Sequence, residues 1–277
     1  MKTPERPLSA DIDFYKFTMG DMIYHKHPDA EVTFTFKNRN LAKGERISRL
    51  VSPEMLRKRL DALRETGFIQ EEIDYLGSLV AKDGAPRFTK EYLDFLSSVR
   101  LPDVDIDIDS ETQELAISST GKWHEVSLWE TVIMSELTEM YTELSMCEQR
   151  LNKDQVWNEA DRRLDEKIFL LGVNPQIKFA EFGTRRRSSY EWQKHVAERL
   201  AEEVPENLIG TSNPWLAHKL GLKAIGTFAH ELPMVYAGLE DAAGNNPLDG
   251  HDKMLKDWEE FHRGDLLIAL TDTFGTE

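Results

Sequence analysis

The chain has 277 residues, of which 40% are hydrophobic, 9% are aromatic and 30% are charged. This length allows one large domain or two unequal ones, and no stretch approaches the ~20 apolar residues that a membrane-spanning helix needs. The 34 basic and 50 acidic side chains give a formal net charge of −16, which argues against general nucleic-acid binding. An anionic ligand would need a local basic site.

The N-terminus, MKTPERPLSADID, has no apolar secretory segment, so we expect a cytoplasmic protein. The single cysteine, Cys147, cannot form an internal disulfide. We interpret it as a small buried residue of a helix.

The first half of the chain indicates helices around a short sheet. Residues 14–25 have helical spacing, and residues 31–36 alternate polar and apolar side chains like a half-buried strand. Ser52 and Pro53 are typical of a helix start, and Gly67 is typical of its end. Further helices are predicted from about residue 71 and, behind a threonine cap, from about residue 90.

Residues 103–109 alternate aspartate with valine and isoleucine, and Glu114 stands twelfth counting from Asp103. This pattern resembles a calcium loop, but its sixth position, where the sharp turn needs glycine, is Ile108. We therefore predict a strand with one solvated face. A strand at 115–119 and helices at 125–144 and 154–171 follow.

From residue 177 onward the pattern becomes strand, polar turn, helix, repeated. Alternating strands and helices of this kind favour an α/β fold with a mainly parallel sheet. The predicted strands are 177–182, 208–209, 224–225 and 266–270, and the predicted helices are 190–204, 214–220 and one from about 233.

A distinctive polar cluster follows each of these four strands. The clusters are the arginines at 185–187, the turn GTSN at 210–213, His230 beside Glu231, and Asp272 in TDTF. Guanidinium groups suit a carboxylate or phosphate, and an imidazole can act as a nucleophile or proton carrier. Because loops after parallel strands converge at one end of the sheet, we predict one shared site.

Each cluster also has a simpler interpretation. Three consecutive arginines can point in different directions and form only surface salt bridges, and GTSN can be only a capped turn. His230 can be a structural hydrogen-bonding group, and Asp272 a helix cap. The convergence of the four clusters decides between the two interpretations.

Six stretches, in order from residue 13, together resemble nicotinate phosphoribosyltransferases. They are DFYKFTM (13–19), EVTFTFKNRN (31–40), LWET (128–131), EFGTRRRSSYEWQ (181–193), GTSNPWLAHKLGLKAIGTFAHE (210–231) and TDTFGT (271–276). The three arginines after FGT fit this family better than the related nicotinamide enzymes. The resemblance implies an incomplete, irregular TIM-like α/β barrel of the type II phosphoribosyltransferase kind, with an N-terminal α+β domain at 1–145 and the first part of the barrel at 146–277.

The resemblance implies transfer of the phosphoribosyl group of phosphoribosyl pyrophosphate to nicotinate, giving nicotinate mononucleotide for NAD biosynthesis. The reaction would be coupled to ATP hydrolysis and would use Mg²⁺. Phe182 and Tyr15 would sandwich the pyridine ring, with Tyr15 supplied by the neighbouring subunit of a homodimer. Stacking of this kind suits a flat aromatic acid.

The resemblance also assigns the polar residues. Arg185, at the family's FGxR arginine, and Arg186 would face the anionic substrates, and Thr227 would line the nicotinate pocket. Two further residues, Ser212 and Asp272, would face phosphoribosyl pyrophosphate. His230 matches the family's phosphorylated histidine and is assigned, with Asp272, to catalysis.

The 277 residues lack the family's RHDSGDP-like segment and its later glycine-rich phosphate loop. We therefore expect an N-terminal portion of the enzyme, whose activity alone is an open question. The alternative function is a non-catalytic half that binds ligand or a complementary chain. A quinolinate-using transferase is disfavoured because that family's lysine-rich pattern is absent. The sequence does not indicate the magnesium ligands.

Overall fold

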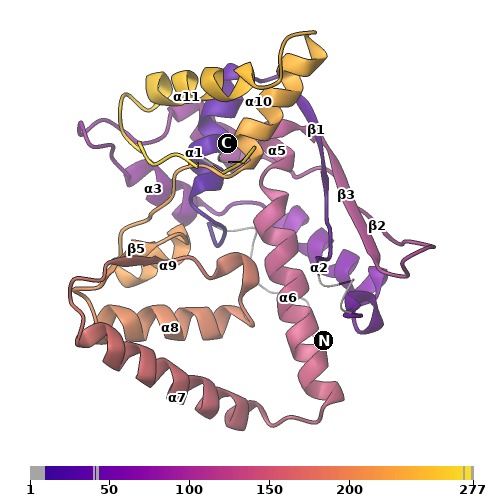
Figure 1. Ribbon diagram of the computed structural model, residues 1–277, viewed down its shortest axis with the longest axis vertical. Helices are drawn as coiled ribbons and strands as arrows, with labels where there is room; N and C mark the ends of the chain where they lie inside the picture. Colours follow the sequence, from indigo (N-terminus) through magenta and orange to yellow (C-terminus); the bar gives the residue numbers. More distant parts are fainter. Residues whose placement is uncertain (1–9, 40, 42–43, 271, 276–277) are drawn as a thin grey trace.

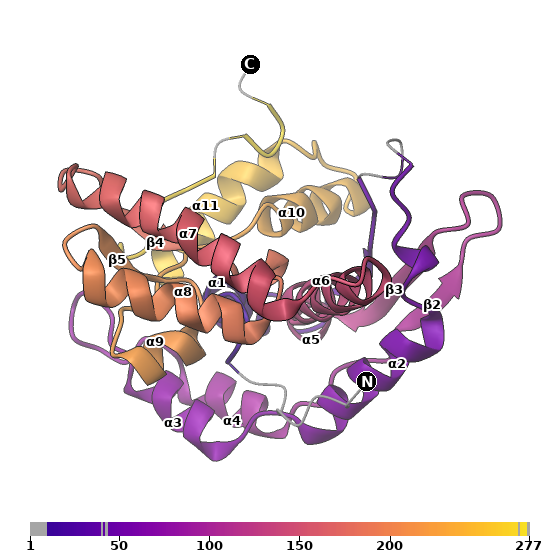
Figure 2. The same ribbon diagram turned by 90° about the horizontal axis from the view of Figure 1, so that it is seen from below.

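The computed structural model describes residues 10–39, 41, 44–270 and 272–275. It contains a three-stranded antiparallel sheet and a two-stranded parallel sheet. A long helix, α6 (Trp129–Glu148), runs between the antiparallel sheet and the helices that accompany the parallel strands (Figures 1 and 2). In the described part of the chain, no helix is long and apolar enough to span a membrane.

The part of the chain before the parallel strands is mostly helical. Its elements are α1 (Tyr15–Lys26), β1 (Glu31–Thr35), the 3-10 helix η2 (Ile47–Arg49), α2 (Pro53–Thr66), α3 (Gln70–Ser78), α4 (Lys90–Ser98), β2 (Asp105–Ile108), β3 (Leu115–Lys122), α5 (Trp123–Val126) and α6. The predicted helix at 14–25 and the predicted strands at 31–36 and 115–119 are therefore confirmed.

The second part alternates helices with short strands. Its elements are α7 (Lys153–Gly172), β4 (Phe179–Glu181), the 3-10 helix η3 (Thr184–Arg186), α8 (Tyr190–Glu203), β5 (Leu208–Thr211), α9 (Pro214–Leu220), α10 (Glu231–Ala242) and α11 (Asp249–Phe261). Helices α10 and α11 lie at one end of the molecule, and α7 and α8 lie at the other (Figure 1).

Local capping explains several helix boundaries. The Ser52 side chain accepts a hydrogen bond from the Met55 amide at 3.3 Å, and Gly67 ends α2 with a φ of 65°. The Thr89 side chain caps α4 in the same way. These caps satisfy amide groups that have no partner inside the helix, so the boundaries can be predicted from neighbouring residues alone.

The antiparallel sheet has the order β1-β3-β2. Thr33 pairs with Thr120, and Ile106 pairs with Ile117. Asp105 and Asp107 are exposed while Ile106 is buried, so the acidic run is a strand with one solvated face, as predicted.

The parallel strands bring three predicted segments side by side. Glu181 of β4 pairs with Thr211 of β5, and Thr211 forms an isolated parallel bridge with Ala224. The Ile225 amide also donates to the Thr211 carbonyl at 2.8 Å. The described residues therefore show three extended parallel segments and no closed barrel.

The strand predicted at residues 266–270 does not form, and this expectation was wrong. Leu266 has a φ of 55°, outside the extended region, and its carbonyl accepts a hydrogen bond from Trp258 Nε1 at 3.0 Å. Leu267 and Ile268 are 66% and 74% exposed. The left-handed residue breaks the extended backbone, so apolar composition alone was misleading.

Buried apolar residues form three clusters in the described chain. The largest packs α2, α4 and α6 against the start of α1, and the second joins α1 to α10 and α11. The third lies between α7 and α8. The buried residues of α6 end at Met140, and Cys147, predicted to be buried, is exposed beyond them.

The chain's first described residues lie against its second half. The Phe14 amide donates to the Ser212 carbonyl at 2.6 Å, and the Trp215 amide donates to the Ala10 carbonyl at 3.0 Å. The division into domains 1–145 and 146–277 stays a prediction. Its boundary lies in the last turn of α6.

Candidate active site

Three of the four predicted clusters lie just beyond the ends of the parallel segments. Arg185 follows β4, Ser212 follows β5, and the turn that leads to His230 and Glu231 follows the segment that bridges at Ala224. The Ser212 amide donates to the Glu181 carbonyl at 2.8 Å, which extends the ladder to the turn itself. The chain therefore brings these turns to one end of the parallel pair, as predicted.

A buried aspartate, Asp13, joins one of these turns to the start of α1. Its carboxylate accepts hydrogen bonds from Ser212 Oγ at 2.7 Å and from the Tyr15 hydroxyl at 3.1 Å. Burial raises the pKa of Asp13, although the hydrogen bonds from Ser212 and Tyr15 and the nearby Arg185 cation oppose that rise. Ser212 is fully buried, and its hydroxyl donates to the Asp13 carboxylate. Because Tyr15 donates to the same carboxylate, Ser212 helps to fix the positions of both Asp13 and Tyr15.

The three consecutive arginines have three different surroundings. Arg187 is buried, and its guanidinium binds Asp11 through two nitrogens at 2.6 and 2.7 Å and Glu139 through Nε at 2.6 Å. Arg186 is exposed. Of the three, Arg185 is half-buried beside Asp13. The arginines do point in different directions, but Arg187 forms buried ion pairs and not the surface salt bridges of the simpler interpretation, so its role is structural.

Arg185 belongs to a continuous line of alternating charges. It donates to Glu130 Oε1 at 2.7 Å, and the other oxygen of Glu130 lies 2.6 Å from Lys16 Nζ. Lys16 also pairs with Glu231, the residue after His230. Burial raises the pKa of Glu130, but Lys16 and Arg185 outweigh it and hold that pKa at about 2.

The turn after the third segment packs against the start of α1. The Thr227 carbonyl accepts a hydrogen bond from Thr18 Oγ1 at 2.5 Å. A Cβ atom on Gly226 would lie 2.9 Å from the Tyr15 amide nitrogen, so a side chain at that position would collide with the α1 backbone. Glycine at this position lets Thr227 approach Tyr15.

His230 and Asp272 lie together on the surface. His230 Nε2 is 3.8 Å from Asp272 Oδ1, and Nδ1 is 3.0 Å from Thr273 Oγ1. Their side chains are 48% and 66% exposed. Both residues are therefore accessible, and they connect to Arg185 through Glu231, Lys16 and Glu130.

Phe182 lies directly after β4 and is 54% exposed. Tyr15, by contrast, is only 8% exposed and contacts Asp13 of the same chain. The sandwich of a pyridine ring between these two residues, and the origin of Tyr15 in a neighbouring subunit, stay predictions.

Sequence reasoning did not single out several charged residues that organise the site. They are Asp11, Asp13, Lys16 and Glu130. A usable signal was present, because the stretch ADIDFYKFTM places three charges in a segment otherwise suited to burial. Buried charges are paired, so such residues indicate ionic partners elsewhere in the chain.

In the part of the chain that the structure describes, no group of three or more His, Cys, Asp or Glu side chains could hold a metal ion. The arrangement of these side chains in the described residues does not fit a metal site built from protein ligands alone. It is compatible with Mg²⁺ that keeps its waters and binds through substrate phosphates and one carboxylate.

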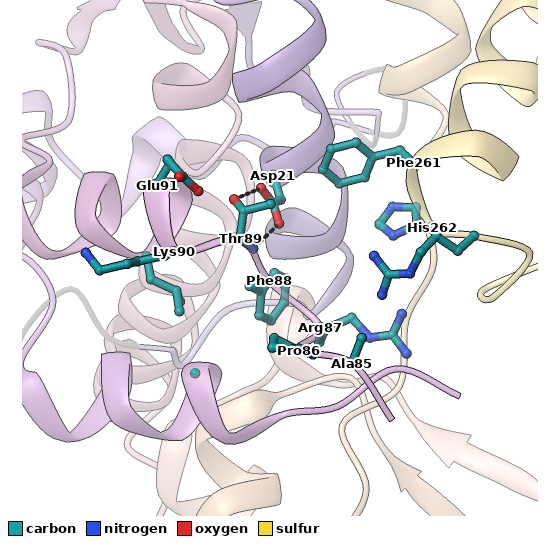
Figure 3. Close-up of a pocket in the computed structure, with 13 residues that line it drawn as sticks. Asp21, Ala85, Pro86, Arg87, Phe88, Thr89, Lys90, Glu91, Phe261 and His262 are labelled. Carbon is teal, nitrogen blue, oxygen red and sulfur yellow. Dashed lines mark hydrogen bonds between the residues drawn. The ribbon is translucent and has the colours of Figure 1, made fainter. Parts of the chain in front are cut away.

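A cavity of about 510 Å³ lies apart from these residues, between α1, the start of α4 and the end of α11 (Figure 3). Its thirteen lining residues include none of the predicted site residues. Asp21 accepts hydrogen bonds from the Thr89 amide at 2.8 Å and the Thr89 hydroxyl at 2.6 Å (Figure 3). This part of the cavity wall is held by a helix cap, which is a structural feature.

The chain is similar to known proteins of one family. The sequence model of the nicotinate phosphoribosyltransferase (NAPRTase) N-terminal domain matches residues 10–138, and that of the NAPRTase family matches residues 177–277. A nicotinate phosphoribosyltransferase of Chromobacterium violaceum is 35% identical, in an alignment that covers 96% of this chain and 64% of that protein.

Two solved structures are also similar. A nicotinate phosphoribosyltransferase from Porphyromonas gingivalis superposes with a TM-score of 0.83 at 29% identity, covering 99% of this chain and 65% of that one. A putative nicotinate phosphoribosyltransferase from Saccharomyces cerevisiae superposes with a TM-score of 0.80 at 26% identity, covering 100% and 66%. The chain thus spans a little under two thirds of the length of these relatives.

Proposed function

Because the chain belongs to the nicotinate phosphoribosyltransferase family, we propose that it binds nicotinate and phosphoribosyl pyrophosphate and forms nicotinate mononucleotide in NAD biosynthesis. The observation that carries the proposal is the placement of Arg185 beside Tyr15, Asp13 and Ser212, at the end of the parallel segments. A guanidinium next to an aromatic ring suits a ligand that is both planar and anionic.

In the proposed reaction, the bond from the ribose anomeric carbon to pyrophosphate breaks, and a bond from that carbon to the nicotinate nitrogen forms. The carbon gains positive charge in the transition state while pyrophosphate gains negative charge. Arg185 and Arg186 would stabilise the departing anion or hold the nicotinate carboxylate. Tyr15 and Phe182 would stack on the pyridine ring, and Thr227 would line its pocket.

Ser212 and Asp272 would face phosphoribosyl pyrophosphate. Since the Ser212 hydroxyl is bonded to Asp13, it would act by fixing that carboxylate and, through it, the Tyr15 hydroxyl. Mg²⁺ would neutralise phosphate charge when bound, with Asp272 as the protein residue best placed to offer one oxygen. A homodimer and a cytoplasmic location belong to the same proposal.

ATP would phosphorylate the exposed imidazole of His230. In that step a bond forms from an imidazole nitrogen to the γ-phosphorus, and the bond to the β-phosphate oxygen breaks, releasing ADP. His230 lies at the N-terminus of α10, where the peptide dipoles favour negative charge. The phosphoryl group would then raise affinity for the other substrates, a coupling of binding free energies.

The test is formation of nicotinate mononucleotide from nicotinate, phosphoribosyl pyrophosphate, ATP and Mg²⁺, with nicotinamide as the control. Faster turnover of nicotinamide would overturn the proposal. In the variant H230A we expect basal transfer to remain and the phosphoryl group to be missing from the intact mass after incubation with ATP. H218A, which changes another partly exposed histidine, should still gain it.

A second candidate function is a ligand-binding part that requires a complementary chain for catalysis. The observation that favours it is the coverage of relatives, since this chain spans 64% of the Chromobacterium protein. Ordinary enzyme turnover by the purified chain alone would exclude this candidate. Binding of phosphoribosyl pyrophosphate without turnover would support it.

A further inference from the structure

Lys16 is a fully buried cation that no step of the proposed reaction uses. Its side chain is 0% exposed, and its ammonium has three partners, which match its three N–H donors. These partners are Glu130 at 2.6 Å, Ser127 Oγ at 3.4 Å, and Glu231. Burying a charge this completely is costly, and the two carboxylates and the hydroxyl around the ammonium offset that cost.

The two carboxylates that Lys16 joins come from distant elements. Glu130 lies in the first turn of α6, and its second oxygen accepts from Arg185 at 2.7 Å. Glu231 lies in the first turn of α10, and its second oxygen accepts from Trp123 Nε1 at 2.7 Å. Lys16 is therefore the only cation that the described contacts place between the two carboxylates.

The line of charges ends at the two places where the proposed steps occur, anion binding at Arg185 and phosphorylation at His230. Arg185 is the proposed anion-binding residue, and Glu231 is joined by one peptide bond to His230. Lys16 Nζ also lies 5.6 Å from the centroid of the Tyr15 ring, which is the proposed stacking surface. A shift of the Lys16 ammonium would change the electrostatic potential at Arg185, at His230 and at the Tyr15 ring.

A phosphoryl group on His230 would add about 1.5 to 2 negative charges next to Glu231. His230 is half exposed, but the Lys16 and Glu231 side chains are 0% and 7% exposed, so the field of that charge is weakly screened between them. It would draw the Lys16 ammonium toward α10 and loosen its pairing with Glu130. Glu130 would then be held chiefly by Arg185, which would fix the guanidinium in one orientation. A guanidinium that is already oriented binds an anion more tightly because less ordering accompanies binding.

We propose that Lys16 is a positioning residue that couples phosphorylation at His230 to anion affinity at Arg185. This inference rests on the proposed function. Lys16 touches no substrate in this proposal. The predicted quantity is the ratio of the Kd for phosphoribosyl pyrophosphate before phosphorylation to the Kd after it, and not either Kd alone.

The experiment measures the Kd of the whole chain for phosphoribosyl pyrophosphate by calorimetry, with and without prior incubation with ATP and Mg²⁺. Intact mass reports the phosphoryl group in the same samples. For the unaltered chain we expect phosphorylation to tighten binding on the order of tenfold, within the usual range for coupled sites. In K16M the phosphoryl group should still be added, and the tightening should fall below about twofold.

K16M leaves Glu130 and Glu231, whose side chains are 22% and 7% exposed, without their shared cation, and the variant can fail to fold. The charge-balanced variant K16M/E231Q removes one of those carboxylates as well, and the glutamine still offers an oxygen to Trp123 Nε1. R59M is the matched control, because Arg59 also neutralises a buried carboxylate of α6, Glu136 at 3.1 Å. R59M should keep the full tightening.

The outcomes separate the two proposals. Phosphorylated K16M/E231Q without tightening, beside R59M with tightening, supports the role of Lys16. Retained tightening in K16M/E231Q, or its loss in R59M as well, overturns that role and leaves the proposed function intact. Loss of phosphorylation only in the Lys16 variants also overturns it, since Lys16 would then act on the phosphoryl transfer. An unaltered chain that is never phosphorylated overturns both proposals.

Discussion

Arg185 and Arg187 are separated by one residue and differ in almost every physical respect. Arg187 is enclosed by carboxylates, whereas Arg185 is half-buried with Glu130 as its ion-pair partner. A string of three identical letters gives no information about this difference. It arises because η3 (Thr184–Arg186) ends between Arg186 and Arg187. Arg185 lies toward the site and Arg186 is exposed, whereas Arg187 follows on extended backbone and is buried.

Replacing Arg185 with alanine should weaken binding of phosphoribosyl pyrophosphate or nicotinate by about 1.5–3 kcal/mol, the usual range for hydrogen bonds to charged groups. The change should appear in Kd measured by calorimetry. R163A, which removes an exposed arginine of α7, should bind as the unaltered chain does. Equal affinities for R185A and R163A would contradict the assignment of Arg185.

Replacing Arg187 with methionine should destabilise the fold. The buried Asp11 carboxylate would lose the guanidinium that balances its charge, and such losses cost about 3–5 kcal/mol. The exposed neighbour gives the control, since R186M should change the free energy of unfolding by less than about 0.5 kcal/mol. Urea unfolding monitored by circular dichroism measures both, and similar midpoints would argue against a structural role for Arg187.

At the scale of elements, local patterns were sufficient wherever a boundary depends on neighbouring residues. Ser52, Gly67 and Thr89 mark helix ends through short-range hydrogen bonds or backbone geometry, and each was placed correctly. The prediction at 266–270 failed because apolar composition does not reveal the left-handed backbone of Leu266 or the exposure of the two residues that follow it.

Two glycines inside helices should respond to alanine in opposite ways. In α1, a Cβ on Gly20 would lie 2.1 Å from the buried Tyr92 hydroxyl oxygen, so G20A should lose about 1–3 kcal/mol through overpacking. In α10, nothing lies within 4 Å of a Cβ on Gly238, so G238A should gain about 0.5–1 kcal/mol from helix propensity.

Thermal or urea unfolding of the two glycine variants checks these signs. The double variant G20A/Y92F removes the hydroxyl that collides, whose buried oxygen has no hydrogen-bond partner. It should recover part of the stability lost in G20A. A stable G20A would mean that α1 and α4 pack less closely than described.

At the scale of the whole molecule, stability should depend on pH through His262. Burial, with a smaller contribution from Arg87, lowers the pKa of His262 to about 3 from an ordinary 6.5. Between these values the unfolded chain binds a proton that the folded chain does not. The free energy of unfolding should therefore fall as pH falls through this window, by up to about 1.4 kcal/mol per unit.

The measurement compares urea unfolding at pH 7 and pH 5.5 for the unaltered chain and for H262F, which keeps a ring against Trp258. The unaltered chain should lose more stability than H262F on this change of pH. Parallel losses in the two proteins would show that His262 does not titrate in this way.

The site itself was partly predictable from sequence. The turns at 182–185, 210–213 and 226–230 could be placed together because parallel strands end at one edge. The contacts of Asp13 with Ser212 and of Lys16 with Glu231 could not, because the partners lie 199 and 215 residues apart. No local pattern specifies which distant residue balances a buried charge.

These long separations have a consequence for synthesis on the ribosome. At about 5–20 residues per second, Lys16 would be translated about 10–40 seconds before Glu231 exists. During that interval Lys16 lacks one of its two carboxylate partners, since only Glu130 has been made. We predict that protease added to stalled nascent chains cuts near residue 16 in those that end before residue 231, and that longer chains become resistant there.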